Sequence, residues 1–266
     1  MNYPNTPSLP SIVLIGAGNL AVNLAKALYR NGYHIEQVYS RTREAARALS
    51  QCVAAEYTNS LASLTSHADL YITALTDRAL PHLLPDIVAG REQALFVHTA
   101  GSIDLNIWQG YAVRYGVFYP MQTFSKQRET DFREIPLFIE SNSPEDCALL
   151  HTVASHLSRK VYTASSEQRR SLHLAAVFAC NFSNCMYALA ADILHEHDLP
   201  FEVMLPLIDE TARKVHQLPP QQAQTGPAIR GDEAVMASHL DLLKAHPDLQ
   251  ELYQAISRQI KPSVKV

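Results

Sequence analysis

The sequence contains little cysteine, and its few cysteines form no recognisable motif. The four residues are scattered without a Cys-x-x-Cys pair, at Cys52, Cys147, Cys180 and Cys185. Disulfide bonds or a zinc site are possible, but without a recognisable motif reduced packing thiols are favoured. We therefore expect a cytoplasmic protein without a bound metal.

The chain also lacks a strong charge of either sign and a long apolar run. Its formal net charge is -4, which gives no reason to expect affinity for nucleic acid or for an anionic membrane. No stretch reaches the ~18 consecutive apolar residues of a membrane span. Residues 1–10 have no basic start followed by an apolar run, and we expect a short flexible tail rather than a signal peptide.

What is present over residues 11–163 is an alternation of strand and helix patterns. An uninterrupted apolar run such as 12–15 is typical of a strand that is buried on both faces of a parallel sheet. Strands are expected at 12–15, 35–39, 70–75, 94–98, 115–119, 137–139 and 161–163, and helices at 19–30, 43–49 and from about Pro144, with Ser143 as N-cap. This order predicts an α/β fold with a doubly wound parallel sheet of the Rossmann type.

The pattern changes after residue 163. Residues 167–197 contain neither glycine nor proline and carry a long apolar stripe, which predicts one unusually long helix. Further helices are expected at 201–214, 232–245 and 249–260, with proline and glycine between them. We therefore predict a Rossmann-type domain over 11–163 and an all-helical C-terminal domain over 164–266.

A glycine-rich turn follows the first predicted strand and opens the first helix. Gly16, Ala17, Gly18, Asn19, Leu20 and Ala21 fit the pattern G-x-G-x-x-G/A. The first glycine permits a tight turn, and the second leaves room for a pyrophosphate beside the backbone. The helix N-terminus supplies N–H donors and partial positive charge. We expect Gly16–Leu20 to bind a dinucleotide; the alternative is a glycine turn that binds no nucleotide.

The end of the second strand indicates which dinucleotide is bound. An NAD-selective protein usually has an acidic residue here that accepts both ribose hydroxyls. This chain has Ser40, Arg41 and Thr42 instead, followed by Arg43. Hydroxyl and guanidinium groups suit a 2′-phosphate, so NADP is the expected cofactor. The alternative is that the arginines are a solvated helix start.

Two later strand ends are expected to lie beside the ribose and nicotinamide, because ligands of open α/β sheets bind beyond the carboxyl ends of the strands. The predicted cofactor residues there are Leu75, Thr76, Asp77, Thr99, Ala100 and Gly101. His98 is a candidate acid or base, since a histidine titrates near neutral pH. It could equally hydrogen-bond the strand end without taking part in chemistry.

The long helix offers a second candidate site. His173, Val177 and Asn181 are spaced i, i+4 and i+8 and share one face, and Asn184 lies three residues beyond Asn181. A histidine and an amide here could orient a carbonyl or carboxylate substrate. They could also satisfy buried backbone groups or a dimer contact. Candidate substrate residues elsewhere are Gln122, Thr123, Thr225 and Arg230.

Together these residues resemble a family of NADP oxidoreductases that join a Rossmann-like domain to a helical C-terminal domain of unknown function. The family is similar to the deazaflavin-dependent NADP oxidoreductases and, more distantly, to pyrroline-5-carboxylate and 3-hydroxyacid reductases. The segments that carry the resemblance are Gly16–Ala21, His98–Ser102, Tyr119–Phe124, His173–Asn181, Thr225–Pro227, Arg230–Asp232 and His239.

The resemblance implies a homodimer formed through helical domains of the 6-phosphogluconate-dehydrogenase-like type, and a cleft between the two domains. At two places the sequence departs from the pattern of the related families. The hydroxyacid branch uses a lysine in its long helix, and residues 167–197 contain none. Tyr119 stands where many relatives have a histidine before proline.

Two functional hypotheses follow. The first is an NADP(H)-dependent oxidoreductase that exchanges a hydride with a small carbonyl or imine compound, with His98, His173 and Asn181 as catalytic residues. The alternative is a non-catalytic NADP(H)-binding sensor or interaction protein, because nucleotide binding does not entail chemistry.

Overall fold

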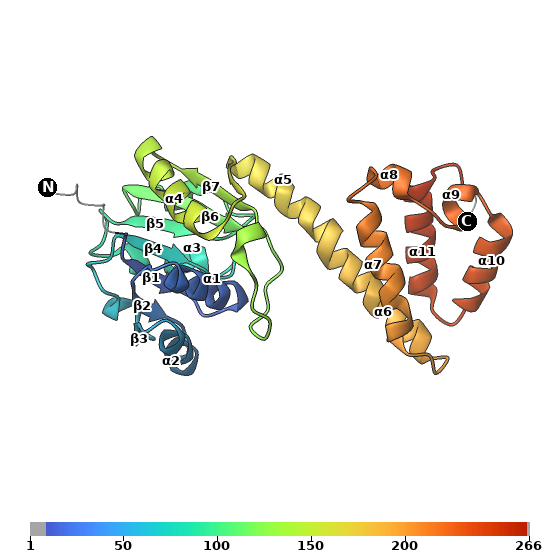
Figure 1. Cartoon of the computed structure of the whole chain (residues 1–266), viewed down its shortest axis with the longest axis horizontal. Coiled ribbons are helices and arrows are strands. Elements are labelled where there is room, and N and C mark those ends of the chain that lie inside the picture. Colours follow the sequence, from blue (N-terminus) through green and yellow to red (C-terminus); the bar gives the residue numbers. More distant parts are fainter. Residues whose placement is uncertain (1–8, 265–266) are drawn as a thin grey trace, which may run out of the picture. The chain divides into compact units, whose positions relative to one another are not determined.

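The computed structural model describes residues 9–264, and the chain divides into two compact units that meet between Cys185 and Met186 (Figure 1). Most of the tail expected over residues 1–10 lies outside the described residues. The change from strands to helices occurs between Thr163 and Ser166. The division into functional domains at residue 164 stays a prediction.

The first unit is built on an eight-stranded sheet with the order β3-β2-β1-β4-β5-β6-β7-β8. Its strands are β1 (Ile12–Ile15), β2 (Ile35–Tyr39), β3 (Glu56–Thr58), β4 (Leu70–Thr73), β5 (Leu95–His98), β6 (Arg114–Pro120), β7 (Leu137–Ser141) and β8 (Val161–Thr163). The first six strands are parallel in the Rossmann order. The predicted doubly wound parallel sheet is confirmed for these six strands; beyond them, β7 pairs antiparallel with β6, and β8 runs parallel to β7.

Helices cover both faces of this sheet. They are α1 (Asn19–Arg30), α2 (Arg43–Cys52), α3 (Leu80–Val88) and α4 (Pro144–Leu157), with short 3₁₀ turns at Leu61–Ser63, Leu105–Trp108 and Phe132–Glu134. The apolar sides of α1, α2 and α4 pack in one cluster, whereas α3 packs in another with Trp108. Because helices cover both faces, the central strands β1, β4 and β5 are buried at every position.

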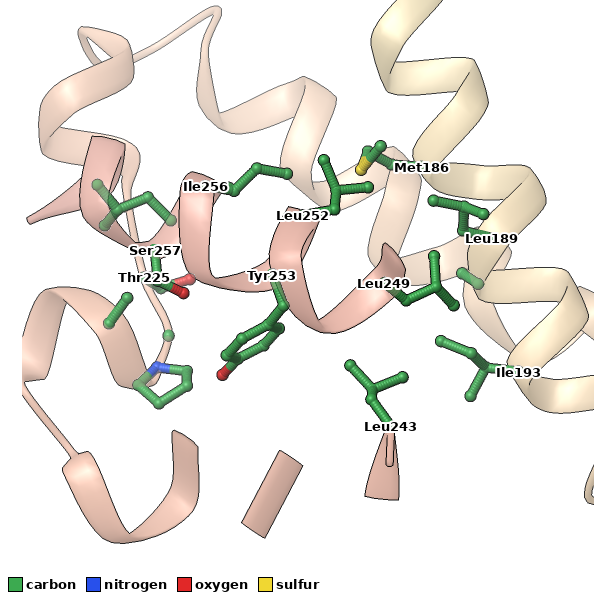
Figure 2. A pocket seen from close by; sticks show the side chains of 15 residues that line it. Met186, Leu189, Ile193, Thr225, Leu243, Leu249, Leu252, Tyr253, Ile256 and Ser257 are labelled. Atoms are coloured by element: carbon green, nitrogen blue, oxygen red, sulfur yellow. The ribbon is translucent and has the colours of Figure 1, made fainter. Parts of the chain in front are cut away.

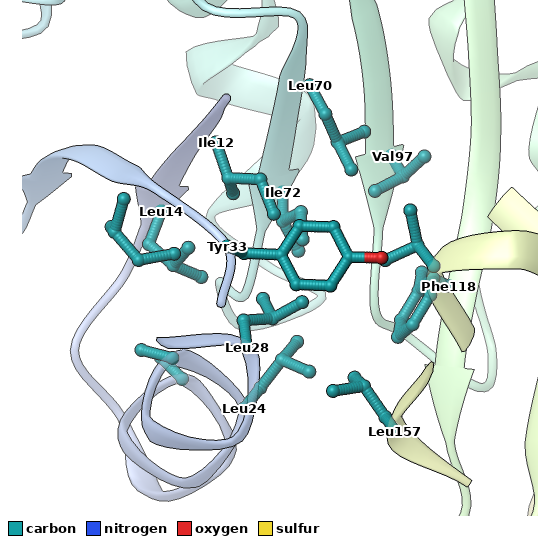
Figure 3. Packing of buried hydrophobic residues seen from close by; sticks show 14 of the residues in the cluster. Ile12, Leu14, Leu24, Leu28, Tyr33, Leu70, Ile72, Val97, Phe118 and Leu157 are labelled. Atoms are coloured by element: carbon teal, nitrogen blue, oxygen red, sulfur yellow. The ribbon is translucent and has the colours of Figure 1, made fainter. Parts of the chain in front are cut away.

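Alternation along the strands divides the core between the two faces. Ile12 and Leu14 belong to the cluster under α1 and α4, whereas Val13 and Ile15 belong to the cluster under α3. Figure 3 shows the first cluster, in which the Tyr33 ring lies among side chains of the central strands and of α1. This packing holds the carboxyl end of β1, and hence the glycine turn, on a rigid support.

Two elements of the first unit were not predicted. Strand β3 is only three residues long and half exposed, so it carries no apolar pattern. Helix α3 contains prolines at its start and at Pro85, which argue against a helix when the sequence is read alone. Its apolar residues Leu80, Leu84, Ile87 and Val88 are nevertheless buried against the sheet.

The predicted long helix extends from Ser166 to His195. It consists of α5 (Ser166–Ala176), a π-helical turn at Val177–Phe182 and α6 (Ser183–His195). By length and composition this helix could cross a membrane, although no sequence run of that length is uninterruptedly apolar. A helix that packs against other parts of a protein can have the same composition. In a single chain, none of the apolar 18-residue window of this helix is buried.

The second unit is helical, as predicted. After the C-terminal part of α6 come α7 (Leu205–Lys214), α8 (Pro220–Ala223), α9 (Pro227–Arg230), α10 (Glu233–Leu242) and α11 (Pro247–Ile260), with a 3₁₀ turn at Phe201–Met204. Asp232 caps α10 by accepting a hydrogen bond from the Val235 amide. A small core of Ala228, Met236 and Val264 lies beside Tyr253 and Ile260.

Candidate functional site

The turn after β1 contains Gly16 and Gly18, and the reason for a glycine differs between these two positions. Gly16 has φ of 124°, and a Cβ at this position would lie 2.3 Å from the Ala74 carbonyl oxygen. Both facts require glycine for the fold itself. A Cβ on Gly18 would meet nothing within 4 Å. Among residues 9–264, no protein atom therefore explains a glycine at position 18, whereas a ligand that approaches the backbone would.

Helix α1 begins directly after this turn with an open N-terminus. Gly18 is its N-cap, no side chain caps the first turn, and that turn contains no acidic residue. Its first N–H groups have no intrahelical partners. The turn therefore offers donors, partial positive charge and space, which is what a pyrophosphate requires.

At the end of β2, the backbone is fixed and the side chains face solvent. The Ser40 amide donates to the Thr58 carbonyl. Arg41 and Thr42 are exposed, and no salt bridge found among residues 9–264 includes Arg41. The Arg43 guanidinium lies 6.0 Å from the centre of the Tyr57 ring. Of these arginines, Arg41 keeps its charge available for an anion.

The loops after β4 and β5 are joined to each other. The Thr99 amide and hydroxyl both donate to the Thr73 carbonyl, at 3.1 and 3.3 Å. The Ser102 hydroxyl donates to the Asp77 carboxylate. Asp77 and Thr76 are exposed, whereas Thr99 and Gly101 are buried. The predicted residues Leu75–Asp77 and Thr99–Gly101 thus belong to adjoining loops at the carboxyl edge of the sheet.

A buried arginine holds the loop after β5. Arg169 in α5 has no exposed surface and donates to the carbonyls of Ala100, Gly101 and Ile103 at 3.0, 3.2 and 2.5 Å. Its other terminal nitrogen donates to Glu140 and to the Ser166 hydroxyl, both at 2.9 Å. This network connects β7, the start of α5 and residues 100–103.

His98 lies within the same part of the structure but is enclosed. It has no exposed surface, and its Nδ1 accepts a hydrogen bond from the Ala100 amide at 3.2 Å. Burial, assisted by the positive charge of Arg169, lowers the pKa of His98 to about 3. The imidazole is therefore neutral at pH 7. Its predicted catalytic role stays a prediction, and the observed contact is the one expected of a histidine that stabilises the strand end.

A cavity of about 570 Å³ lies between the segment after β6 and helix α5 with its π turn. Its size is within the ~300–1,000 Å³ range of small-molecule sites. The lining is mostly apolar, and its polar groups come from Tyr119, Gln122, Thr123, His173 and Asn181. The π turn at Val177–Phe182 contributes the wall around Asn181, and such turns are frequent at functional sites.

The cavity directly adjoins the loop after β5 through His173. A Cβ added to Gly101 would lie 2.6 Å from Nδ1 of His173 and 2.9 Å from its Cβ. The Tyr119 hydroxyl lies 3.2 Å from the same Nδ1. The predicted cofactor residue Gly101 and the polar end of the cavity are therefore in contact.

The remaining predicted substrate residues lie elsewhere. Asn184 is exposed and outside the residues that line this cavity. In the second unit, Thr225 lines a separate apolar cavity of about 310 Å³, near Tyr253 and Ser257 (Figure 2). Arg230 is exposed at the end of α9. The substrate roles of these residues stay predictions.

Two residues of this region were missing from the sequence-based set. Arg169 lies one helical turn before His173 and so shares its face, but an isolated arginine gives no sign that it is buried. Tyr119 belonged to the segment Tyr119–Phe124 that was expected to line the substrate cavity, but it was given no role of its own and was noted as a departure from the histidine of relatives. Its hydroxyl pairs with His173 across 54 positions of the sequence, and no local pattern predicts such a contact.

Comparison with known proteins identifies the family. Residues 11–101 match the family described as NADP oxidoreductase, coenzyme F420-dependent, and residues 135–260 match a domain of unknown function, DUF2520. The chain is 64% identical to putative NADP oxidoreductase BF3122 from Bacteroides fragilis, over 94% of this chain and 97% of that chain, with a TM-score of 0.91. The chain belongs to this family of NADP oxidoreductases. The predicted cofactor, NADP, is the dinucleotide for which the family is named.

More distant solved structures share the fold. An imine reductase from Myxococcus stipitatus, in complex with NADP+, has 18% identity and a TM-score of 0.69, with 96% of each chain covered. A reductive aminase from Aspergillus terreus, in complex with NADPH and ethyl levulinate, has 14% identity and a TM-score of 0.71, covering 97% of this chain and 95% of that chain. No curated protein matches the sequence.

Proposed function

We propose that this protein is an NADP(H)-dependent reductase that reduces a small carbonyl or imine compound in the cavity beside His173. The observation that carries the proposal is the contact between Gly101, in the loop expected to hold the nicotinamide, and the His173 imidazole at the polar end of that cavity. A reductase needs a dinucleotide and a proton-donating group in this kind of proximity.

The chain's own residues fit the cofactor. The open N-terminus of α1 and the vacant space beside Gly18 suit the pyrophosphate, which residues Gly16–Leu20 would hold. Ser40, Arg41 and Thr42 would bind the 2′-phosphate, and the loops at 75–77 and 99–101 the ribose and nicotinamide. When bound, NADPH supplies the hydride. Everything else, including orientation, exclusion of water and movement of a proton, depends on the protein.

The substrate would occupy the cavity of about 570 Å³. Its walls are mainly apolar, and its polar groups are uncharged apart from the titratable His173 and Tyr119. Asn181, Gln122 and Thr123 can hydrogen-bond a carbonyl or imine and so orient it. Similarity in fold to an imine reductase and a reductive aminase supports this choice of substrate class.

A homodimer is part of the proposal. Leu174, Phe178 and Phe182 form a stripe along the long helix at i, i+4 and i+8, and are 59%, 63% and 48% exposed in a single chain. Patches of this kind mark interaction sites, and a second copy would cover them.

The four cysteines are free thiols, which supports the cytoplasm as the compartment.

The function is tested by following NADPH oxidation with a panel of aldehydes, ketones and cyclic imines, ethyl levulinate included. We expect turnover of at least one compound, and submicromolar to micromolar binding of NADPH in a calorimetric titration. NADPH binding without turnover of any compound would overturn the reductase and favour the sensor. Absence of binding would overturn both.

The oligomeric state is measured separately from the activity. Light scattering behind a sizing column should give twice the chain mass of 29.6 kDa, and Phe178→Glu should reduce it to the monomer mass. A monomer at micromolar concentration, or a protein that is recovered only with detergent, would contradict the dimer.

A further inference from the structure

Tyr119 and His173 form a pair that connects the sheet to the long helix. Tyr119 is near the carboxyl end of β6, and His173 is in α5. The phenol oxygen lies 3.2 Å from Nδ1 of the imidazole, and the two rings meet edge to face at 68° with centres 6.3 Å apart. Phe138 packs against the other side of the Tyr119 ring, at 6.3 Å between centres. The phenol is therefore held in one position.

The two members of the pair differ in their access to water. Tyr119 is 7% exposed and contributes to the cavity wall. His173 is exposed, and its ring lies between Tyr119 and the loop at Gly101. Both members line the cavity, but only the exposed His173 is open to proton exchange with solvent.

We propose that Tyr119 is the catalytic residue that gives the proton to the reduced substrate, and that His173 returns a proton to Tyr119. This inference rests on the proposed reduction and names the groups that complete it. With His173 as the imidazolium, its Nδ1–H donates to the phenol oxygen. The phenol O–H is then free to donate into the cavity, toward a substrate oxygen or nitrogen.

The atoms and electrons balance. Reduction of a C=O group forms one C–H bond with the hydride from the nicotinamide and leaves the π-electron pair on oxygen. That pair forms an O–H bond with the Tyr119 proton as the phenol O–H bond breaks. The phenol oxygen then takes the Nδ1 proton of His173, and the neutral imidazole takes one proton from water. Each turnover consumes one NADPH and one proton.

The electrostatics of the site suit a donor that stays protonated. Burial raises the pKa of the Tyr119 phenol; the Arg169 guanidinium opposes this rise, and the Asp77 carboxylate adds to it. Arg169, Asp77 and His173 are the charged or titratable groups that act on the phenol among the described residues. A phenol that gives its proton to the substrate must take up another, and His173 is the titratable group that lies within hydrogen-bond distance of it among the described residues.

A first test needs neither cofactor nor substrate. Nitrogen NMR of histidine-labelled protein reports the tautomer and the hydrogen bonding of His173 directly. We expect Tyr119→Phe to change the Nδ1 chemical shift of His173, with an unchanged melting temperature. Tyr162→Phe is the matched control, because Tyr162 stacks on the same Phe138 but lies outside the cavity lining. An unchanged His173 signal in Tyr119→Phe would overturn the pair.

A second test uses whichever compound of the panel is reduced. Tyr119→Phe should lower kcat by about 100-fold or more, the usual contribution of a general acid, while the Kd for NADPH changes less than twofold. His173→Gln should also lower kcat, because the Tyr119 phenol then lacks the group that restores its proton. Full turnover of Tyr119→Phe would overturn the inference and leave the reductase intact. Lack of any turnover in the native protein would contradict the reductase, and with it the inference.

Discussion

Gly101 and His173 contact each other so closely that a methyl group on residue 101 would lie 2.6 Å from the imidazole Nδ1. The same methyl would lie 2.9 Å from the His173 Cβ, so rotation of the ring cannot relieve the overlap. The absence of a side chain at residue 101 is therefore what allows helix α5 to approach the loop after β5. Several consequences of this arrangement can be measured.

Gly101→Ala should destabilise the protein by about 1–3 kcal/mol, the range found when a packed site is overfilled. It should also lower turnover, because α5 must shift and carry His173 with it. Urea denaturation and steady-state kinetics measure the two effects. Stability and turnover equal to those of the native protein would show that the contact is not close.

Gly18→Ala should separate folding from cofactor binding. Nothing lies within 4 Å of the added methyl, so the unfolding free energy should change by less than about 0.5 kcal/mol, as for an ordinary surface substitution. NADPH affinity should fall at least tenfold because the methyl occupies the path of the pyrophosphate. Gly16→Ala is the contrasting variant, since its methyl would overlap the Ala74 carbonyl and prevent normal folding. Native NADPH affinity in Gly18→Ala would contradict the assigned pyrophosphate position.

Arg41→Ala should change the choice of dinucleotide. Loss of one charge-assisted contact to the 2′-phosphate should weaken NADPH binding by about tenfold, or ~1.4 kcal/mol, and leave NADH binding unchanged. Arg47→Ala is the control, because Arg47 is an exposed arginine on α2. Calorimetric titration with both dinucleotides measures the difference. An equal loss for NADH would assign Arg41 to another role.

Arg169→Met should cost far more stability than Arg170→Met. Removing Arg169 leaves Glu140 and the carbonyls of the loop after β5 without their partner, and breaking a buried ion pair costs about 3–5 kcal/mol. Arg170 pairs with Asp104, but both side chains are nearly half exposed, and such pairs contribute about 0–1 kcal/mol. Urea midpoints of the two variants measure the contrast, and similar midpoints would mean that the buried network is not important for stability.

His98 should make the protein sensitive to acid. The pKa of His98 is about 3 in the folded protein and about 6.5 in an unfolded chain. Between these two pH values, the unfolded state therefore binds one proton more than the folded state. The stabilisation is complete above about pH 6.5 and is lost as the pH falls toward 3, by at most ~1.4 kcal/mol per pH unit. His98→Asn should flatten this dependence, whereas His67→Asn, at an exposed position, should not. Equal slopes for both variants would contradict the assignment.

Much of the fold could be predicted because its determinants are local. The uninterrupted apolar run at 12–15, the glycine turn at Gly16–Gly18 and the cap at Ser143 each specify their own element. The short strand β3 and the proline-containing helix α3 could not be predicted, because only burial against the sheet makes their conformations favourable. The reversed direction of β7 likewise depends on which strand edge is available to it.

The sequence by itself determined the glycine turn after β1, the expectation of NADP and the change to helices after residue 163, since each depends on residues that are near neighbours in the chain. Only the tertiary structure decided that Arg169 is buried beneath the loop at Gly101 and that Tyr119 meets His173. Those contacts join β6, α5 and the β5 loop, which are distant in sequence. They exist because the sheet places its carboxyl ends along one edge and α5 packs against that edge.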